Sequence, residues 1–155
     1  MSQIIIRKAK IEELPILLEF EKGVFTAERP FNPTIKEESG HYYDIEQLIL
    51  SPKSECLVAE IDEKIVGSGY ALIEKAKDYF THDEHSYLGF MYVLPEYRGR
   101  GINKMVMDEL IDWSKKRGIT EFRLDVYTEN QGAIRAYEKA GFSNLIVEMR
   151  MKLEE

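Results

Sequence analysis

The sequence has little cysteine and no long apolar run. The single cysteine, Cys56, excludes a disulfide within the chain and favours a reducing compartment, so we expect a cytoplasmic protein. Cys56 lies in a strand-like run, which predicts a buried thiol rather than a nucleophile. The apolar run that follows Met1 is too short for a signal peptide, and no run reaches membrane-spanning length. We therefore expect no membrane partner.

Positive charge is also scarce. The 155 residues contain 21 Lys and Arg against 28 Asp and Glu, and the net charge of −7 argues against a nucleic-acid partner. An acidic surface favours cationic substrates, although it also serves solubility. The length predicts one domain that spans residues 1–155.

Apolar periodicity predicts an α/β fold. We expect strands at 3–8, 56–61, 65–73, 86–94, 119–126 and 142–153, and helices at 11–20, 44–50, 102–117 and 130–140. Residues 23–40 and 75–84 lack a clear period and predict loops. Gly67 and Gly69 predict a bulge or a close backbone approach. The order βααβββαβαβ predicts a mixed, twisted central sheet flanked by helices on both faces, with a parallel, right-handed unit from Phe90 to Val126.

The stretch 90–104, Phe-Met-Tyr-Val-Leu-Pro-Glu-Tyr-Arg-Gly-Arg-Gly-Ile-Asn-Lys, is the most informative. Pro95 cannot donate to a sheet ladder, so the strand ends there. Gly99 and Gly101 permit backbone angles that other residues resist, and a helical period starts at Ile102. Amides at such a helix N-terminus predict a phosphate site. Taken by itself, the stretch also fits a glycine turn without a ligand.

Two known phosphate-binding loops fit this stretch poorly. A nucleoside-triphosphate loop requires Gly-Lys-Ser/Thr, which is missing, and a dinucleotide fingerprint requires a glycine at Lys104. The run from Arg98 to Ile102 instead resembles motif A of the GNAT N-acyltransferases, in which Arg or Gln, two residues, Gly, one residue, and Gly or Ala follow one another. Asn103 stands where that family usually has Gly or Ala.

A second stretch, 125–142, resembles motif B of the same family. The resemblance rests on Asn130, Ala133-Ile134, Tyr137 and Gly141-Phe142. Each part also has a structural interpretation, since Asn130 can cap a helix and Gly141 can end one. Together the two motifs stand in the family order, and the resemblance to an N-acetyltransferase (GNAT) domain covers roughly 58–142.

The resemblance implies acetyl-CoA as the cosubstrate and no metal. Its pyrophosphate is expected to lie across the amides from Arg98 to Asn103, and its pantetheine arm to pair with the backbone at Met91 and Val93. The implied cofactor-binding residues are Met91, Tyr92, Val93, Arg98, Gly99, Arg100, Gly101, Ile102, Asn103, Lys104, Asn130 and Tyr137.

The family also implies a direct attack by an amine on the thioester. In this scheme the Val93 amide polarises the carbonyl and Tyr137 is the general acid for the leaving thiolate. The general base is unassigned, because the strand near Phe90 carries no acid. The candidates, whose loops should border the acceptor slot, are Glu28, Asp78, His82, Asp83, Glu84 and His85. Metal binding by the two histidines is a less favoured interpretation than solvated loop histidines.

The function expected from the sequence is therefore transfer of an acetyl group from acetyl-CoA to a primary amine of a small molecule or protein. The partner is the amine acceptor, and the protein is expected to be a monomer or homodimer. The alternative is a non-catalytic acyl-CoA-binding or sensing module.

Overall fold

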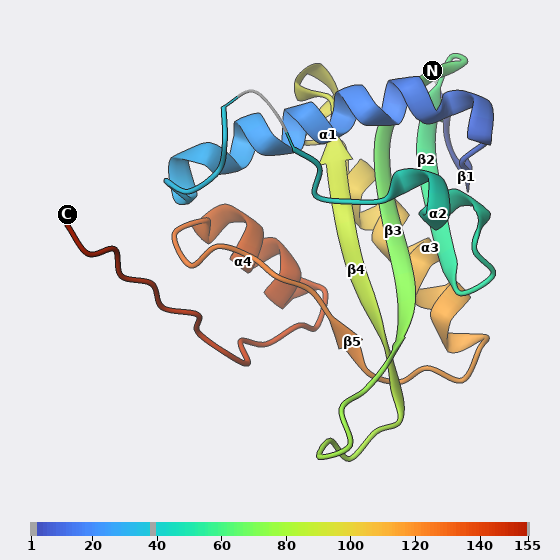
Figure 1. The fold of residues 1–155 in the computed structure, drawn as a ribbon. Helices are drawn as coiled ribbons and strands as arrows, with labels where there is room; N and C mark the ends of the chain where they lie inside the picture. Colours follow the sequence, from blue (N-terminus) through green and yellow to red (C-terminus); the bar gives the residue numbers. More distant parts are fainter. Residues whose placement is uncertain (1–2, 38–39, 155) are drawn as a thin grey trace. The chain divides into compact units, whose positions relative to one another are not determined.

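A computed structural model describes residues 3–37 and 40–154 of the chain (Figure 1). The chain divides into two compact units, Met1–Asp125 and Val126–Glu155. The first unit contains the sheet and most of the helices, and the second contains one helix and an extended segment.

The first unit is built on a five-stranded sheet in the order β1-β2-β3-β4-β5. Neighbouring strands are antiparallel from β1 to β4, whereas β4 and β5 are parallel, which confirms the predicted mixed sheet and its parallel unit. The strands are β1 (Ile4–Lys8), β2 (Ser54–Ile61), β3 (Lys64–Lys75), β4 (Glu84–Val93) and β5 (Phe122–Arg123).

Helices cover both faces of this sheet, as predicted (Figure 1). One face carries α1 and α2, and the other carries α3. The helices of the unit are η1 (Ile11–Glu13), α1 (Leu14–Glu28), η2 (Arg29–Phe31), α2 (Ile45–Leu50), η3 (Pro95–Tyr97) and α3 (Ile102–Lys115). Asp44 begins α2 as a cap, because its side chain accepts a hydrogen bond from the Gln47 amide.

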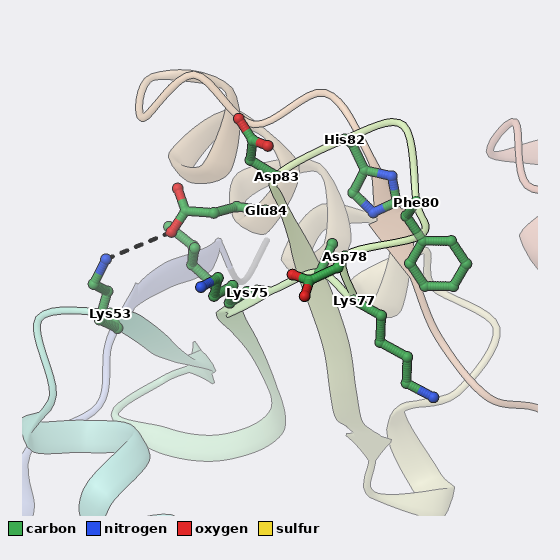
Figure 2. Close-up of a pocket in the computed structure, with 10 residues that line it drawn as sticks. Lys53, Lys75, Lys77, Asp78, Phe80, His82, Asp83 and Glu84 are labelled. Carbon is green, nitrogen blue, oxygen red and sulfur yellow. Dashed lines mark ion pairs between the residues drawn. The ribbon is translucent and has the colours of Figure 1, made fainter.

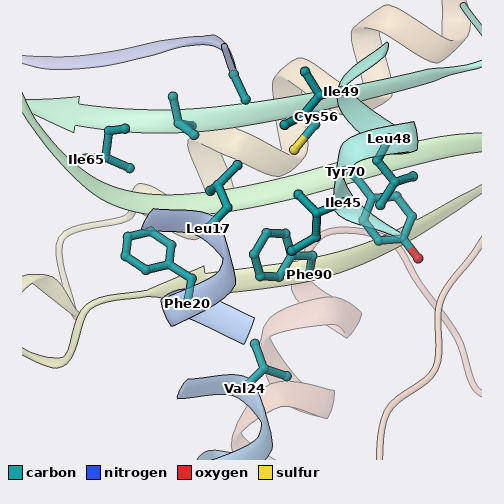
Figure 3. Packing of buried hydrophobic residues seen from close by; sticks show 12 residues of the cluster. Leu17, Phe20, Val24, Ile45, Leu48, Ile49, Cys56, Ile65, Tyr70 and Phe90 are labelled. Atoms are coloured by element: carbon teal, nitrogen blue, oxygen red, sulfur yellow. The ribbon is translucent and has the colours of Figure 1, made fainter. Parts of the chain in front are cut away.

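The main apolar core lies between the sheet and the α1 and α2 helices. Leu17 and Phe20 of α1 and Ile45 of α2 pack against Cys56 and Phe90 of the sheet (Figure 3). Cys56 is fully buried, and burial raises the pKa of its thiol to about 12, so it is a core residue as predicted.

The opposite face approaches α3 closely at Gly69. A Cβ there would lie 2.7 Å from the Met91 sulfur and 2.8 Å from Cγ1 of Val106 in α3. The β3–β4 register also shifts between Ser68 and Tyr70. Both features confirm the predicted bulge and close backbone approach, which seat the start of α3 against the end of β4.

The first long helix is longer than predicted. The sequence pattern predicts a helix at 11–20 followed by a loop at 23–40, but α1 continues to Glu28. Phe20 and Val24 extend its apolar stripe by one turn and are buried. Gly23 does not break the helix, because its missing side chain leaves room for the Tyr92 phenol. Residues 38–39 of the predicted loop lie outside the described residues.

The strand predicted at 119–126 is shorter than expected, because only Phe122 and Arg123 pair with β4. The sequence shows the apolar pattern of a strand, but the number of paired residues depends on how far the partner strand runs beside it. This early separation leaves the rest of β4 without a described neighbour on that side.

The second unit contains α4 (Gln131–Lys139), close to the helix predicted at 130–140. The strand predicted at 142–153 is wrong, because residues 142–154 form neither helix nor strand. Val147, Met149 and Met151 show the alternation of a strand but are 68–88% exposed. Alternation sets which side chains share a face, but a strand also needs a partner backbone. The observed order is thus βααβββαβα.

Candidate functional site

The glycine loop, residues 98–101, joins η3 to α3 at the end of β4. Gly99 has φ +82° and Gly101 has φ +78°, a left-handed conformation that a side chain would strain. Gly101 is the residue that precedes the first turn of α3. A Cβ at either glycine would meet no atom within 4 Å, so the loop surface is open.

The first turn of α3 places backbone donors at this open surface. The Met105 amide donates to the Gly101 carbonyl at 3.1 Å, which is the first hydrogen bond of the helix. The amides of Ile102, Asn103 and Lys104 precede it and have no intrahelical acceptor. Together with the positive end of the helix dipole, they form a site that is suited to a phosphate.

Basic side chains surround the loop but are held in different ways. Arg98 donates from Nε to the Val93 carbonyl oxygen at 2.9 Å, which ties the loop to the end of β4. The Arg100 guanidinium lies 4.9 Å from the ring centre of Tyr97, and Lys104 pairs with Asp108 at 2.7 Å. Arg100 and Lys104 are exposed, so their charges can reach an anion on the loop.

Asn103, which departs from the family pattern, carries a buried polar atom. Its Oδ1 has no hydrogen-bond partner among the described residues. An unpaired buried acceptor is costly in a folded protein. No hydrogen bond among the described residues therefore accounts for a polar side chain at this position.

An unpaired edge of β4 leads to the glycine loop. Pairing with β5 is limited to Ser86 and Tyr87, so within the described chain no strand pairs with residues 88–93 on that side. The Leu94 amide donates to Val66 on the β3 side at 2.8 Å. Because neighbouring residues of a strand face opposite edges, the amides of Met91 and Val93 face the unpaired edge.

The backbone of β4 is strained within this edge. Phe90 has φ +56°, a left-handed conformation that is uncommon for a residue with a large side chain. It lies at the register shift between β3 and β4, where Gly69 has no regular partner. Such a bulge re-aims backbone groups within a strand, and strained residues of this kind cluster at functional sites.

The second unit carries the other two predicted cofactor residues. Asn130 caps α4, with its side chain accepting from the Ala133 amide at 3.3 Å. Tyr137 is half-buried on α4, and its ring packs edge-on against Phe142 with 6.0 Å between centroids. Its assignment as the general acid stays a prediction.

The hairpin loop between β3 and β4 lies at the Glu84 end of β4, away from Val93 and the glycine loop, and the assignment of a base among its residues stays a prediction. Val93 is the last of the ten residues of β4, which begins at the loop, so the two lie about 30 Å apart at 3.3 Å per residue. Asp78, His82, Asp83 and Glu84 instead line a pocket of about 590 Å³ beside the loop (Figure 2). A mixture of charges surrounds this pocket, including the Lys53–Glu84 pair at 3.6 Å.

His85, the fifth of these candidates, lies next to the same loop. Its Nδ1 is 3.2 Å from Nε2 of His82, and burial lowers its pKa. No group of three or more potential metal ligands occurs among the residues that the structure describes. Glu28, the sixth candidate, lies at the end of α1 and is hydrogen-bonded to Tyr42, whose neighbour Tyr43 packs against Phe90 of β4.

Three tyrosines on the α1 face of the sheet are not marked by any motif in the sequence. Tyr43 precedes α2, Tyr70 lies on β3 and Tyr87 lies on β4, and their rings are in contact. The available signal is weak, namely a pair of aromatic residues directly before a helix cap in an otherwise polar loop.

Comparisons with known proteins agree with the geometry. A family profile described as "Acetyltransferase (GNAT) family" matches residues 22–142. The Thialysine N-epsilon-acetyltransferase of Mus musculus is 30% identical over 105 residues, which cover 61% of this chain and 59% of that protein. The chain thus matches little more than half of that relative's length.

Solved structures share the fold at low sequence identity. A tetramutant of the BH1408 protein from Bacillus halodurans aligns with a TM-score of 0.83 and 22% identity, over 96% of this chain and 99% of that chain. A predicted acetyltransferase from Clostridium acetobutylicum, determined with acetyl-CoA, gives 0.73 and 19% identity over 97% and 96%. Among the described residues, no helix is long and apolar enough to cross a membrane.

Proposed function

The chain belongs to the GNAT acetyltransferase family, and we propose that it is an N-acetyltransferase that transfers an acetyl group from acetyl-CoA to a primary amine. The observation that carries this proposal is the glycine loop and helix start at the end of β4, directly beside the unpaired edge of that strand. A phosphate site and a strand edge in this order suit a ligand with a phosphate end and an amide-containing arm.

The residues at the loop fit the pyrophosphate of coenzyme A. The first-turn amides of Ile102, Asn103 and Lys104 follow the open glycine loop, whereas the Arg98 amide donates to the Pro95 carbonyl; Arg100 and Lys104 add positive charge. Hydrogen bonds to a charged group contribute about 1.5–3 kcal/mol each, so a few of them suffice to anchor the ligand. Ile102 is buried under the first turn and keeps that turn in place.

The unpaired edge of β4 fits the pantetheine arm. The backbone groups of Met91 and Val93 face this edge, whereas Tyr92 faces β3 in the ladder and packs its ring on Phe20 of α1. We assign the Val93 amide to the thioester carbonyl, where a fixed donor stabilises the negative charge that develops on the oxygen. Arg98 donates to the Val93 carbonyl and thereby fixes the Val93–Leu94 peptide, which directly follows the peptide that carries the Val93 amide.

The reaction forms a bond between the amine nitrogen and the acetyl carbon and breaks the carbon–sulfur bond. For a lysine-like amine with a pKa of about 10.4, the neutral nucleophile at pH 7 costs about 4.6 kcal/mol. The ammonium loses two protons in total, the sulfur takes one from Tyr137, and Tyr137 regains its proton from solvent. A phenol with an ordinary pKa of about 10 keeps its proton at neutral pH, which suits it to this role. Asn130 holds the start of the helix that carries Tyr137.

The partner proposed is an amine acceptor, and the protein acts as a monomer or homodimer in the cytoplasm. A reducing compartment suits the single, fully buried Cys56. The acceptors named for relatives, such as thialysine, are amines, which supports the class of acceptor and leaves its identity open.

The decisive experiment combines calorimetry with acetyl-CoA and a thiol-release assay over a panel of amines. We expect binding of acetyl-CoA and amine-dependent release of free thiol. Binding without release on any amine would favour a non-catalytic acyl-CoA-binding module. Absence of both binding and release would refute the proposal.

A further inference from the structure

A buried carboxylate holds the segment before α2 against α1. Glu21 of α1 is only 2% exposed. Its Oε2 accepts from the amides of Tyr42 at 2.9 Å and Tyr43 at 3.0 Å, and its Oε1 contacts Nδ1 of His41 at 2.7 Å. These bonds of the carboxylate all go to three consecutive residues. A buried charge needs such partners, so the conformation of residues 41–43 is fixed by α1.

The fixed segment delivers the Tyr43 phenol to the bulge of β4. The ring of Tyr43 packs 5.0 Å from that of Phe90, and the strained Phe90 backbone amide hydrogen-bonds to the phenol. The Tyr43 backbone amide is therefore held by Glu21, and its phenol is held by the Phe90 backbone, beside the part of β4 that leads to Met91 and Val93.

Tyr43, Tyr70 and Tyr87 form a row, which we name the tyrosine row. The ring centroids of Tyr43 and Tyr70 are 5.6 Å apart, and those of Tyr70 and Tyr87 are 6.4 Å apart. The Tyr70 phenol lies over Gly89, where a Cβ would come within 2.7 Å of its oxygen. Figure 3 shows the Tyr70 hydroxyl pointing away from the apolar core that its ring joins.

A carboxylate stands at each end of the tyrosine row. Asp125 accepts a hydrogen bond from the Tyr87 phenol, and Glu28 acts electrostatically on Tyr43 and is hydrogen-bonded to Tyr42. Burial raises the pKa of Tyr87, and the charge of Asp125 raises it further. The phenols therefore remain neutral donors at any physiological pH.

Among the described residues, no basic side chain pairs with these two carboxylates. The ion pairs formed by residues 3–37 and 40–154 involve other acids, such as Glu13, Glu60, Glu74 and Asp108, and none involves Glu28 or Asp125. Glu28 is partly buried, and this burial raises its pKa. A partly buried acid without a cation is poorly stabilised unless a cationic ligand supplies the missing charge.

From this arrangement we infer that the tyrosine row with Glu28 and Asp125 is the acceptor site, and that it selects small amines carrying two ammonium groups. The inference rests on the proposed function and names the substrate class. One ammonium is bound by one carboxylate while the other end of the molecule presents its nitrogen beside β4. Aromatic faces attract the same cations, so the row favours a flexible aliphatic diamine. Glu21 is a positioning residue, because it acts through Tyr43.

The test compares cadaverine with pentylamine, two amines with the same carbon chain and two or one ammonium groups. Calorimetry on the coenzyme A complex measures binding, and the thiol-release assay measures kcat/KM. We expect cadaverine to exceed pentylamine by at least about tenfold in both, since one charged contact to a carboxylate differs between them.

Two variants ask whether the named carboxylates cause this preference. Glu28→Gln and Asp125→Asn should each lower the ratio of cadaverine to pentylamine affinity about tenfold, while acetyl-CoA affinity changes little. Glu19→Gln on the same α1 helix and Asp112→Asn on α3 are matched controls, because both acids are exposed and paired with lysines. These controls should keep the preference.

The two proposals fail in different ways. Equal binding and turnover of the two amines, or a preference that survives both carboxylate variants, would overturn the acceptor site while thiol release upholds the acetyltransferase. Absence of acetyl-CoA binding and of thiol release would overturn the proposed function, and with it the inference.

Discussion

The glycine loop and the segment 41–43 both meet β4, but different physics holds each in place. The loop owes its shape to two left-handed glycines and to the start of α3, all within a few residues of sequence. The segment 41–43 owes its shape to Glu21, which lies on α1, 21 residues before Tyr42. The first is built from backbone and the second from one buried side chain.

This difference has consequences for how each region responds to substitution. A backbone site tolerates most side-chain changes and is lost when its backbone angles or its charge change. A segment held by a buried carboxylate loses its conformation when that carboxylate changes, because both of its amide donors lose a charged acceptor. Substitutions in each region therefore separate the two cases.

The largest effect is expected for Gly101→Glu. A carboxylate among the amides of the glycine loop would repel the phosphates, and acetyl-CoA affinity should fall by at least about 100-fold. Calorimetry measures the affinity, and circular dichroism checks that the fold persists. Gly118→Glu is the matched control, because Gly118 has φ +83° with no atom near its Cβ position and ends α3 instead of preceding it.

The control should carry the same backbone strain and keep its acetyl-CoA affinity. A folded Gly101→Glu protein with unchanged affinity would contradict the phosphate assignment and leave the loop as a structural turn. Loss of binding in both glycine variants would point to backbone strain alone.

The same contrast decides how much can be predicted from sequence. The glycine loop, the cap at Asn130 and the core position of Cys56 follow from short-range patterns, because the residues that define them are neighbours in the chain. The bonds of Glu21, the position of Tyr43 at the bulge and the contact of Tyr87 with Asp125 join distant residues, and no local pattern encodes them. Hence sequence patterns point to the proposed cofactor residues but not to the residues of the proposed acceptor site.

Two expectations, one wrong and one untested, show the same limit of sequence patterns. The predicted strand at 142–153 has the right alternation, but no periodicity tells whether a partner strand is present. The six candidate bases lie on segments that flank predicted elements, but five of them lie at the far end of β4 from Val93. The pairing of the strands decides which loops lie together at one end of a sheet, and the local sequence pattern does not contain that pairing.

The second prediction concerns Tyr137→Phe. Tyr137 lies on α4, outside both regions, and the substitution tests the proposed proton donation to the leaving thiolate. If Tyr137 donates the proton to the thiolate, kcat should fall by about 100-fold, the low end for general acid–base catalysis, because water partly replaces the acid. Acetyl-CoA affinity should change little. Tyr79→Phe, at a phenol that is 73% exposed on the hairpin, is the control. Unchanged turnover in Tyr137→Phe would leave Tyr137 as a packing residue.

The third prediction is directed at the segment 41–43. Glu21→Gln keeps the volume but removes the charge that two backbone amides share, and the free energy of unfolding should fall by about 2–3 kcal/mol. Urea denaturation measures this loss. Glu19 is an exposed residue two positions before Glu21 on α1, and Glu19→Gln should change the free energy of unfolding by less than about 0.5 kcal/mol.

The comparison between the two regions predicts that Glu21→Gln leaves acetyl-CoA affinity within about threefold of the wild type, because the glycine loop does not depend on α1. Its diamine binding should weaken together with the stability. A large loss of acetyl-CoA affinity would show that the two regions are coupled through β4 and that they are not independent.

The smallest effect is expected for Asn103→Ala, within the glycine-loop region itself. Asn103 Oδ1 is buried without a described protein partner, and Asn is a poorer helix former than Ala, so the change should raise the free energy of unfolding by about 1 kcal/mol. If backbone amides alone hold the pyrophosphate, acetyl-CoA affinity should change by less than about threefold, because alanine keeps the Asn103 amide. Thermal denaturation and calorimetry on the same preparations measure both quantities. A gain in stability coupled to a tenfold loss of affinity would mean that the Asn103 side chain itself binds the phosphate, so that the glycine loop would depend on a side chain as the segment 41–43 does.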